Sequence, residues 1–484
     1  MNGIMVIPKE IKKVISELQI AGYEAYIVGG CVRDFLLGIE PKDWDVTTNA
    51  KPEEIQKVFP NNFYENNFLT VTVRTGSKKI QEVEVTTYRL EAAYSDKRHP
   101  DDLSFAKTLE EDLARRDFTV NAMAMDEKKK IVDLFNGQED LKKKIIRTVG
   151  NPDDRFLEDA LRMLRAVRFA TTLDFSIEEA TAQAIKKNSL WLEAISKERV
   201  RDEFSKMIMA KKASDGIELL REMNLLKYVM PELLENYGVT QNKHHIYDCY
   251  HHALKALEFS AKKNFNFQVR MASLLHDIAK PKTKVGQGPN ATFYNHQIVG
   301  AKMAFGMLSR LKFPKKETEK IAMLIRYHMF YYNTDEVSES SVRRLVKNVG
   351  PENMEELLQL RQADRIGSGV PKAEPYKLRH LRYIIDKVSK DPISAKMLKL
   401  NGSDIMELLN IEPGPKVGQI LDVLLGYVLD DPKKNTKEWL SKEVEKLGKL
   451  DEKELKSLAE KSKEEKEEIQ EEQDTDIKNK YWVK

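Results

Sequence analysis

Glycines, an arginine and two aspartates near the start of the chain form an arrangement suited to nucleotide chemistry. Gly29 and Gly30 precede Arg33, and Asp43 and Asp45 follow shortly after. A glycine pair lets backbone N–H groups approach a phosphate closely, because no Cβ intervenes. On a strand, Asp43 and Asp45 would point to the same face and could share a divalent cation. The pattern predicts nucleotidyl transfer from a metal-bound triphosphate.

A third carboxylate and two adjacent arginines lie further along. Glu84 belongs to an alternating, strand-like run and could face the same metal ions. Three carboxylates around two Mg²⁺ ions suit in-line attack of a hydroxyl on an α-phosphate. Arg115 and Arg116 come before a strand-like segment and are suited to clamping phosphates. Taken alone, Glu84 would be interpreted as an exposed strand glutamate, and Arg115 and Arg116 as part of a surface ion-pair cluster. The prediction therefore depends on their joint presence.

An aspartate and three arginines recur at every third residue, at Asp159, Arg162, Arg165 and Arg168. On one helix, Asp159 and Arg162 would lie a turn apart. A carboxylate accepts from an exocyclic amine, and a guanidinium donates to a ring nitrogen. Cytosine and adenine present that edge, whereas guanine and uracil invert it and would leave buried groups unpaired. The pair therefore predicts a pocket for C and A, and an ordinary salt-bridge stripe is the alternative.

The elements that must position these groups change character along the chain. Early on, a helix is expected at 10–19 and strands at 25–28, 71–73 and 82–86. After Asn151-Pro152, helical periodicity dominates, with helices expected at 160–170, 199–209 and 213–223. The predicted domains are 8–150, 151–236, 237–370, 371–450 and 451–484, the last being Lys/Glu-rich and expected to form a solvated or frayed helix.

Composition narrows the class of protein. The length of 484 residues allows about three domains, and the net charge of +3 is too small to indicate a nucleic-acid partner by itself. Cys31 and Cys249 are the only cysteines, which excludes a disulfide framework and fits a reducing compartment. The sequence has neither a membrane-length apolar run nor a signal pattern. A soluble, cytoplasmic protein is expected.

Taken in order, the motifs GGCVRDFLLG, DWD, EVEVTTYR, RRDFTVNAMA and EDALRMLRAVRF resemble the bacterial class II tRNA nucleotidyltransferase and poly(A) polymerase family. The resemblance covers residues 20–240. It implies a DNA polymerase β-like head with a mixed sheet, followed by helical neck, body and tail domains. It also implies template-independent addition of C, C and A to the 3′ end of tRNA, with CTP and ATP as substrates and amino-acid side chains selecting the base.

The same resemblance assigns roles residue by residue. Asp43 and Asp45 would bind Mg²⁺, with Glu84 as the third carboxylate. The triphosphate and sugar would be held by Gly30, Arg33 and Arg116. The base would be read by Asp159 and Arg162, with Arg165 and Arg168 completing the pocket. The chain departs from the family at Phe68-Leu69-Thr70, where many relatives have a glycine before the threonine, and at His99, where an arginine is common.

Small features separate the members of this family. Residues 94–100 match the flexible loop that lets the pocket switch from C to A, which disfavours a CC-adding enzyme. Asn121-Ala122-Met123-Ala124 is of the CCA-adding type and disfavours a poly(A) polymerase. An A-adding enzyme stays an alternative. The segments Asn401–Ile405 and Pro413–Gly418 resemble the helical tail that supports the tRNA elbow.

A second constellation consists of histidines and aspartates in the middle of the chain: His252, His276, Asp277, His296, His328 and Asp364. These groups suit a mono- or dinuclear centre of borderline metals. LLHDIAK and QAD resemble the HD-type metal-dependent phosphohydrolases over 240–370. The resemblance implies one ion on His252, His276, Asp277 and Asp364, and a possible second on His296 and His328.

The metal of this centre would be Mg²⁺, Mn²⁺ or Ni²⁺. His252 is preferred over His251 because it opens a His-x-Leu pattern. The alternatives are a degenerate, purely structural helical domain and, from another class, a phosphohydrolase whose head only docks tRNA.

Overall fold

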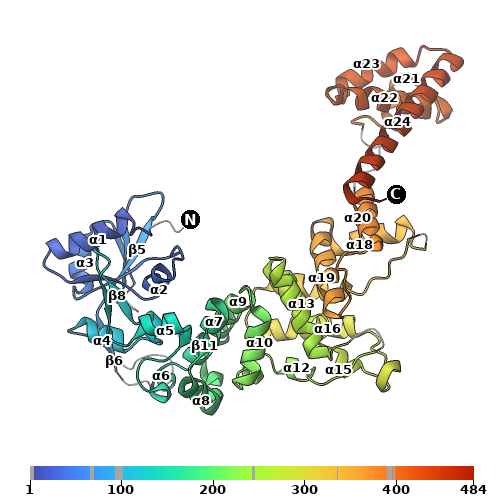
Figure 1. The fold of residues 1–484 in the computed structure, drawn as a ribbon. Coiled ribbons are helices and arrows are strands. Elements are labelled where there is room, and N and C mark those ends of the chain that lie inside the picture. The colour runs from blue at the N-terminus through green and yellow to red at the C-terminus, as the bar shows by residue number, and fades with distance from the viewer. Residues whose placement is uncertain are drawn as a thin grey trace. The chain divides into compact units, whose positions relative to one another are not determined.

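The computed structural model describes residues 5–65, 70–92, 102–242, 246–334, 336–389, 395 and 398–483 (Figure 1). The chain divides into two compact units. One comprises Met1–Met329 with Gln359–Pro371, and the other comprises Phe330–Leu358 with Lys372–Lys484. A mixed sheet lies at the start of the first unit and helices dominate the rest, which confirms the predicted class, α/β followed by mostly α. The five predicted domains are a finer division and stay a prediction.

A seven-stranded sheet in the order β3-β4-β5-β2-β1-β8-β9 forms the centre of the head, residues 8–150. Its strands are β1 (Ala25–Val28), β2 (Asp45–Thr48), β3 (Asn62–Glu65), β4 (Thr70–Arg74), β5 (Glu82–Thr87), β8 (Met123–Met125) and β9 (Ile131–Asp133). Neighbouring strands are antiparallel except β2 and β5, which are parallel and align Asp45 with Glu84. A separate hairpin joins β6 (Arg89–Ala92) to β7 (Asp102–Phe105).

Alternation explains why these segments are strands. In β5, Val83 and Val85 are buried while Glu82 and Glu84 are exposed, so the period of two places valines in the core and carboxylates on the open face. The predicted strands at 25–28, 71–73 and 82–86 are confirmed. Asp43 is an exception, because it lies in a bend before β2 and not on the strand itself.

The helices of the head are α1 (Lys9–Ile20), α2 (Gly30–Leu36), α3 (Pro52–Val58), α4 (Leu109–Ala114) and α5 (Gly137–Lys143). α1 and α3 pack against the sheet and against each other (Figure 1). The segment directly after Arg116 is not the expected strand but a 3-10 turn, Thr119–Asn121. Asp117 accepts hydrogen bonds from the Phe118 N–H and from the Asn121 side chain, and such local bonds compete with strand pairing.

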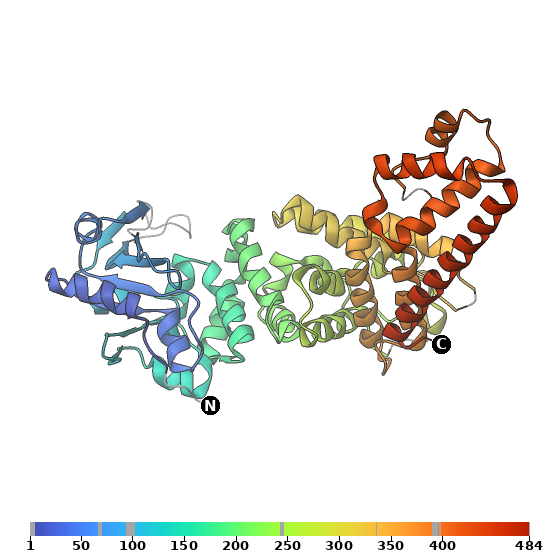
Figure 2. The same ribbon diagram turned by 90° about the horizontal axis from the view of Figure 1, so that it is seen from above.

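Helices predicted after Asn151-Pro152 are present. The first unit continues with α6 (Pro152–Glu158), α7 (Leu161–Leu173), α8 (Glu179–Asn188), α9 (Lys197–Ile208), α10 (Ala213–Glu222), α11 (Leu226–Val229), α12 (Pro231–Leu234), α13 (Cys249–Lys262), α14 (Phe267–Leu275), α15 (Lys280–Thr283), α16 (His296–Arg310) and α17 (Lys315–Tyr327). A short parallel pair, β10 (Ile145–Ile146) and β11 (Ser176–Ile177), accompanies α7. The helices α13, α14, α16 and α17 pack on one another as a bundle (Figure 2, green to yellow).

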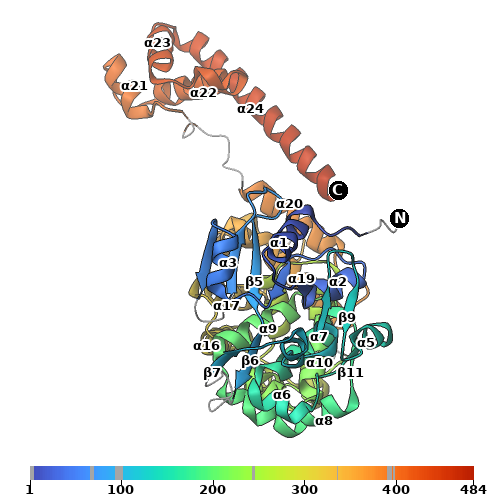
Figure 3. The same ribbon diagram turned by 90° about the vertical axis from the view of Figure 1, so that its left-hand side faces the viewer.

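The second unit contains α18 (Glu339–Val349), α20 (Tyr376–Ser389), α21 (Gly402–Leu409), α22 (Pro415–Asp430), α23 (Lys437–Leu447) and α24 (Glu452–Tyr481), while α19 (Met354–Gly367) passes from this unit into the first. α24 is one long helix that packs on α22 and α20 (Figure 3). Leu455 and Ala459 are buried in the α22 core, so the Lys/Glu-rich extension is a helix, as expected, but packs on one side. Among the described residues, no helix is long and apolar enough to cross a membrane.

Candidate active site and a second titratable cluster

Three carboxylates meet at one edge of the head cavity. The parallel register sets Asp45 beside Glu84, and Asp43 lines the same cavity of about 840 Å³ from the bend before β2. The structure therefore brings the three predicted carboxylates together, although Asp43 arrives from a bend. Burial, and next the charge of Glu84, raise the pKa of Asp45 to about 6. A divalent cation would remove this repulsion, and oxygen donors are what Mg²⁺ prefers.

Arginines line a second cavity, of about 460 Å³, which shares Asp45 and Glu84 with the first. It is bounded by Arg89, Arg115 and Arg116. The buried Asp112 holds two of these guanidinium groups, with Arg115 at 2.7 Å and Arg116 at 3.4 Å. Although burial opposes ionisation, these arginines keep the pKa of Asp112 below its ordinary value. One cavity wall therefore carries cations that can face a triphosphate next to the carboxylates.

Gly29 is required at the point where the turn formed by Gly29 and Gly30 contacts Arg116 of the second cavity. Its φ is +84°, in the region that favours glycine, and a Cβ there would lie 2.9 Å from Arg116 Nη1. Gly30 opens α2, which carries Arg33. The Arg33 guanidinium donates to Asn121 Oδ1 at 2.8 Å and pairs with Asp34. The backbone turn and the two predicted triphosphate arginines thus form one contiguous surface.

The spacing predicts Asp159 and Arg162 one turn apart on one helix, but the structure places only Arg162 on a helix. Asp159 directly follows α6 in non-helical geometry, and its Oδ1 accepts from the Leu161 N–H at the start of α7. Its carboxylate makes two bonds, of 2.7 and 3.2 Å, to Arg199 of α9. Arg162 lies on α7 and bonds Glu158 at 2.5 Å and the Arg115 carbonyl at 3.0 Å. Each predicted base reader is therefore held by a partner of its own.

Arg165 and Arg168 project from α7 into buried ion pairs. Arg165 binds Asp117 of the head through two bonds of 2.6 and 2.8 Å, and Arg168 binds Glu203 of α9 at 2.7 Å. Burial opposes the charge on Asp117, but Arg165 prevails and lowers its pKa to about 2. The Arg168 guanidinium also lies 3.4 Å from the centre of the Phe169 ring. These two arginines hold α7 to its neighbours.

Four charged partners were not identified from the sequence: Asp112, Asp117, Arg199 and Glu203. Asp112 lies on α4 and precedes Arg115 and Arg116, which directly follow that helix, by three and four residues, a spacing that could have indicated it. No local spacing links Asp159 to Arg199, because 40 residues separate them. The predicted switching loop 94–100, including His99, and Phe68-Leu69 lie outside the described residues.

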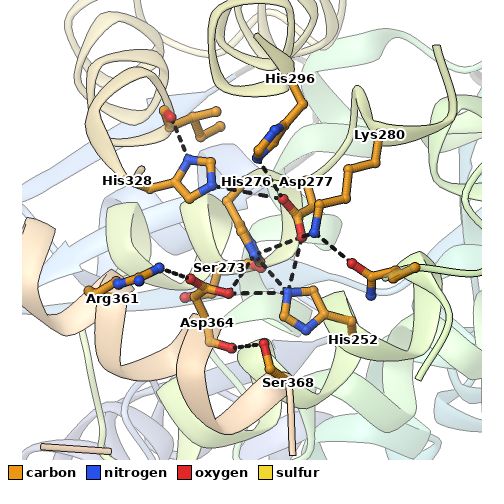
Figure 4. Close-up of polar contacts among 12 residues, drawn as sticks. His252, Ser273, His276, Asp277, Lys280, His296, His328, Arg361, Asp364 and Ser368 are labelled. Carbon is orange, nitrogen blue, oxygen red and sulfur yellow. Dashed lines mark hydrogen bonds and ion pairs between the residues drawn. The ribbon is translucent and has the colours of Figure 1, made fainter. Parts of the chain in front are cut away.

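The six histidines and aspartates of the middle region converge in one place (Figure 4). They come from α13, the end of α14, the start of α16, the end of α17, and α19. His252 Nε2 lies 2.9 Å from His276 Nε2, 3.1 Å from Asp277 Oδ2 and 3.4 Å from Asp364 Oδ1. His251 is exposed and bonds Asp248 instead, which agrees with the choice of His252.

Two donor sets share Asp277 in this cluster. One is His252, His276 and Asp277, the other Asp277, His296 and His328, and within each set the donor atoms lie within 4.8 Å of one another. Asp364 adds a further oxygen to the first set, 3.6 Å from His276 Nε2. Lys280 also reaches Asp277, at 2.6 Å. We call these six residues, His252, His276, Asp277, His296, His328 and Asp364, the histidine cluster.

Main-chain carbonyl groups orient the imidazoles toward the centre. His276, His296 and His328 place Nδ1 at 2.9, 2.7 and 2.7 Å from the carbonyl oxygens of Ser273, Phe293 and Ile325. A carbonyl only accepts, so Nδ1 donates and Nε2 is left as the ligand atom. His296 Nε2 and His328 Nε2 are buried and make no hydrogen bond within the described part of the chain. Burial lowers the pKa of His328 to about 3. Burial opposes the charge of His276, but Asp277 prevails and raises its pKa to about 10, so a divalent metal bound there would have to displace a proton. Imidazoles and carboxylates together fit a borderline divalent metal.

The fold and the head site define a nucleotidyltransferase. Family models match as follows: the poly A polymerase head domain at residues 25–147, the probable RNA and SrmB-binding site of polymerase A at 174–236, and the putative tRNA nucleotidyltransferase domain 2 at 292–444. The last match spans His296, His328 and Asp364, and the resemblance to HD-type phosphohydrolases stays a prediction.

Named relatives extend these matches over nearly the whole chain. The CCA-adding enzyme of Ligilactobacillus salivarius is 35% identical over 457 residues, 90% of this chain and 99% of that protein. That of Lactococcus lactis is 32% identical over 447 residues, 90% and 97% of the two chains. The crystal structure of Bacillus stearothermophilus CCA-adding enzyme in complex with CTP matches with a TM-score of 0.60 and 27% identity, over 91% of this chain and 98% of that one. The chain belongs to the CCA-adding enzyme family.

Gly29→Ala is expected to impair nucleotide use more than Gly38→Ala. Both glycines have positive φ, but a Cβ at Gly29 meets Arg116 at 2.9 Å, whereas one at Gly38 meets nothing within 4 Å. Displacing the guanidinium by a fraction of an ångström should lower kcat/KM for CTP about tenfold or more. Steady-state incorporation kinetics of the two variants provide the measurement. Equal effects would show that backbone strain alone matters.

Asp117→Asn is expected to destabilise the protein in a pH-dependent way. The pKa of Asp117 falls from 3.8 to about 2 on folding, so its stabilisation is complete above pH 4 and is lost as the pH falls through 2. The shift corresponds to about 2 kcal/mol at neutral pH. Urea unfolding at pH 7 and pH 3 checks this, with the exposed Asp154→Asn as control. A difference between the variants that does not shrink at pH 3 would contradict the assignment.

Proposed function

We propose that this chain adds C, C and A to the 3′ end of tRNA, using CTP and ATP and no nucleic-acid template. The observation that carries the proposal is the placement of Asp45 and Glu84 between two cavities, one acidic and one lined by arginines. An attacking hydroxyl and a triphosphate must meet at the carboxylates from different directions for in-line displacement. The tRNA end and the incoming nucleotide would therefore occupy the two cavities that share this carboxylate pair.

Asp43, Asp45 and Glu84 would hold Mg²⁺. Bound there, the metal would lower the pKa of the attacking hydroxyl and neutralise charge on the triphosphate. Arg116, fixed by Asp112 and packed against Gly29, would bind phosphate oxygens, and Arg33 would hold the sugar and triphosphate beside it. These groups are in place before the nucleotide arrives, so little reorganisation would be needed at reaction.

Asp159 and Arg162 would read the base while remaining attached to their partners. A carboxylate has about four acceptor positions, so Asp159 can accept from the amine of cytosine or adenine while Arg199 stays bound. The Glu158 bond orients Arg162 to donate to the ring nitrogen. Because guanine and uracil present the opposite pattern, they would leave these buried groups unpaired. The relatives named CCA-adding enzyme favour full CCA addition over A addition alone or poly(A) synthesis.

Incorporation onto tRNA transcripts tests this function. Transcripts ending at the discriminator base, at C and at CC, offered CTP and ATP separately and together, should gain two C residues and one A and then stop. Asp45→Asn should lower the rate at least about 100-fold, because metal stabilisation of the transition state is worth several kcal/mol. The exposed Glu53→Gln on α3 serves as control. Addition only to the CC end would indicate an A-adding enzyme, and long A tails a poly(A) polymerase.

As a second activity, we propose metal-dependent hydrolysis of phosphoesters at the histidine cluster. The buried Nε2 atoms of His296 and His328, each oriented by a carbonyl behind it, favour this over a purely structural domain. Mn²⁺ or Ni²⁺ suits the nitrogen-rich donors better than Mg²⁺. Cyclic 2′,3′-phosphates and 2′-phosphates at damaged RNA ends are the proposed substrates.

Metal titration tests the second centre. Metal-free protein should bind Mn²⁺ or Ni²⁺, and His276→Ala and Asp277→Ala should weaken binding at least about tenfold, because each removes a ligand. His251→Ala is the matched control, since His251 is exposed and adjacent to His252. Hydrolysis of 2′,3′-cyclic and 2′-phosphate substrates should follow metal occupancy. Binding that is equal in all variants, or metal-independent turnover, would refute the proposal.

A further inference from the structure

Gly367 of α19, three residues after Asp364, lies against His252 of α13. A Cβ at Gly367 would lie 2.9 Å from the His252 carbonyl oxygen, 3.0 Å from its Nδ1 and 3.1 Å from its Cε1. The first distance is shorter than real Cβ contacts, and the other two are tighter than most. Both the backbone and the imidazole of His252 therefore rest against a position where a side chain has no room (Figure 4 shows the neighbouring Asp364, Ser368 and His252).

This contact determines how far apart two proposed metal ligands lie. His252 Nε2 is 3.4 Å from Asp364 Oδ1, which sits one turn before Gly367 on the same helix. Ser368 donates to the Asp364 carbonyl, so the turn that carries both residues is continuous. A methyl group at 367 would push the imidazole or the whole of α19 away. Metal–ligand distances tolerate only about 0.2 Å of such displacement.

We infer that Gly367 is a positioning residue for the histidine cluster, which lets α19 bring Asp364 within reach of the ion held by His252. The inference rests on the proposed metal centre. Gly367 would not touch the metal but would act through His252. Residues that orient a ligand in this way typically alter metal affinity about 10–100-fold when changed.

Other glycines of the same bundle show that the constraint is local. A Cβ at Gly300 of α16 would make only ordinary contact, 3.5 Å from the His276 carbonyl, and one at Gly306 would meet nothing within 4 Å. Both lie on α16, which begins at His296, and Gly306 is exposed. Alanine at either position should therefore be accepted, and Gly306→Ala is a matched control for the helix propensity gained by Gly367→Ala.

The test compares wild type, Gly367→Ala and Gly306→Ala, each as the full-length chain freed of metal. Titration with Mn²⁺ and the visible spectrum with Co²⁺ report affinity and ligand geometry. Gly367→Ala should bind Mn²⁺ about 10–100-fold more weakly, with an altered Co²⁺ spectrum, while Gly306→Ala matches wild type. CCA addition should be unchanged in both variants, because the head site lies elsewhere. In an Asp364→Asn background, Gly367→Ala should cause less further loss of affinity.

Each other outcome is decisive. Unchanged Mn²⁺ affinity in Gly367→Ala would overturn the role of Gly367 while leaving the metal centre intact. Failure of this variant to fold, or loss of CCA addition with it, would make Gly367 a purely structural residue and also overturn the inference. Absence of metal binding in wild type would overturn the proposed centre itself, and Gly367 would fall with it.

Discussion

The parallel pairing of β2 with β5 is the constraint on which the head site depends. It places Asp45 directly beside Glu84, although like charges at paired positions of a sheet destabilise it. The register is enforced from the opposite face, where Val46 and Val85 are fully buried. A slip by one residue would turn those valines to solvent. Apolar burial thus holds two carboxylates together, and the raised pKa of Asp45 reflects first its burial and then the charge of Glu84, which a bound cation would offset.

A chain of ion pairs extends this organisation from the head to the helices that follow. Asp117 of the head binds Arg165 of α7, and Glu203 of α9 binds Arg168. Arg199, on the same α9, binds Asp159. Partly or fully buried pairs of this kind contribute little net stability compared with apolar packing, but removing one partner leaves an uncompensated charge. Their value lies in geometry, since they fix the α6–α7 junction, where the base would be read, relative to the carboxylates.

The sequence predicts local features of this molecule better than long-range ones. The strand position of Glu84 follows from alternation over a few residues, and the donor types of the histidine cluster follow from the motifs. The prediction that Asp159 and Arg162 lie on one helix is wrong, because α6 ends at Glu158. Periodicity does not reveal a break within a charged run. The Arg199 bond could not be predicted, because it depends on how α9 packs. Which imidazole nitrogen faces the centre likewise depends on carbonyl groups that only the fold supplies.

The histidine cluster and the base-reading region share a scaffold. Arg270 of α14 is 2% exposed and donates to the carbonyl oxygens of Ile208, Ala210 and Phe265, the first two at the end of α9. A buried guanidinium is tolerated only when such acceptors satisfy it. α14 runs on into His276 and Asp277, and α9 carries Arg199. The helix that presents two cluster residues therefore also caps the helix that holds Asp159. This packing role does not require hydrolysis. The presence of these helices is therefore no evidence of catalysis. The support for catalysis is the orientation of the imidazoles.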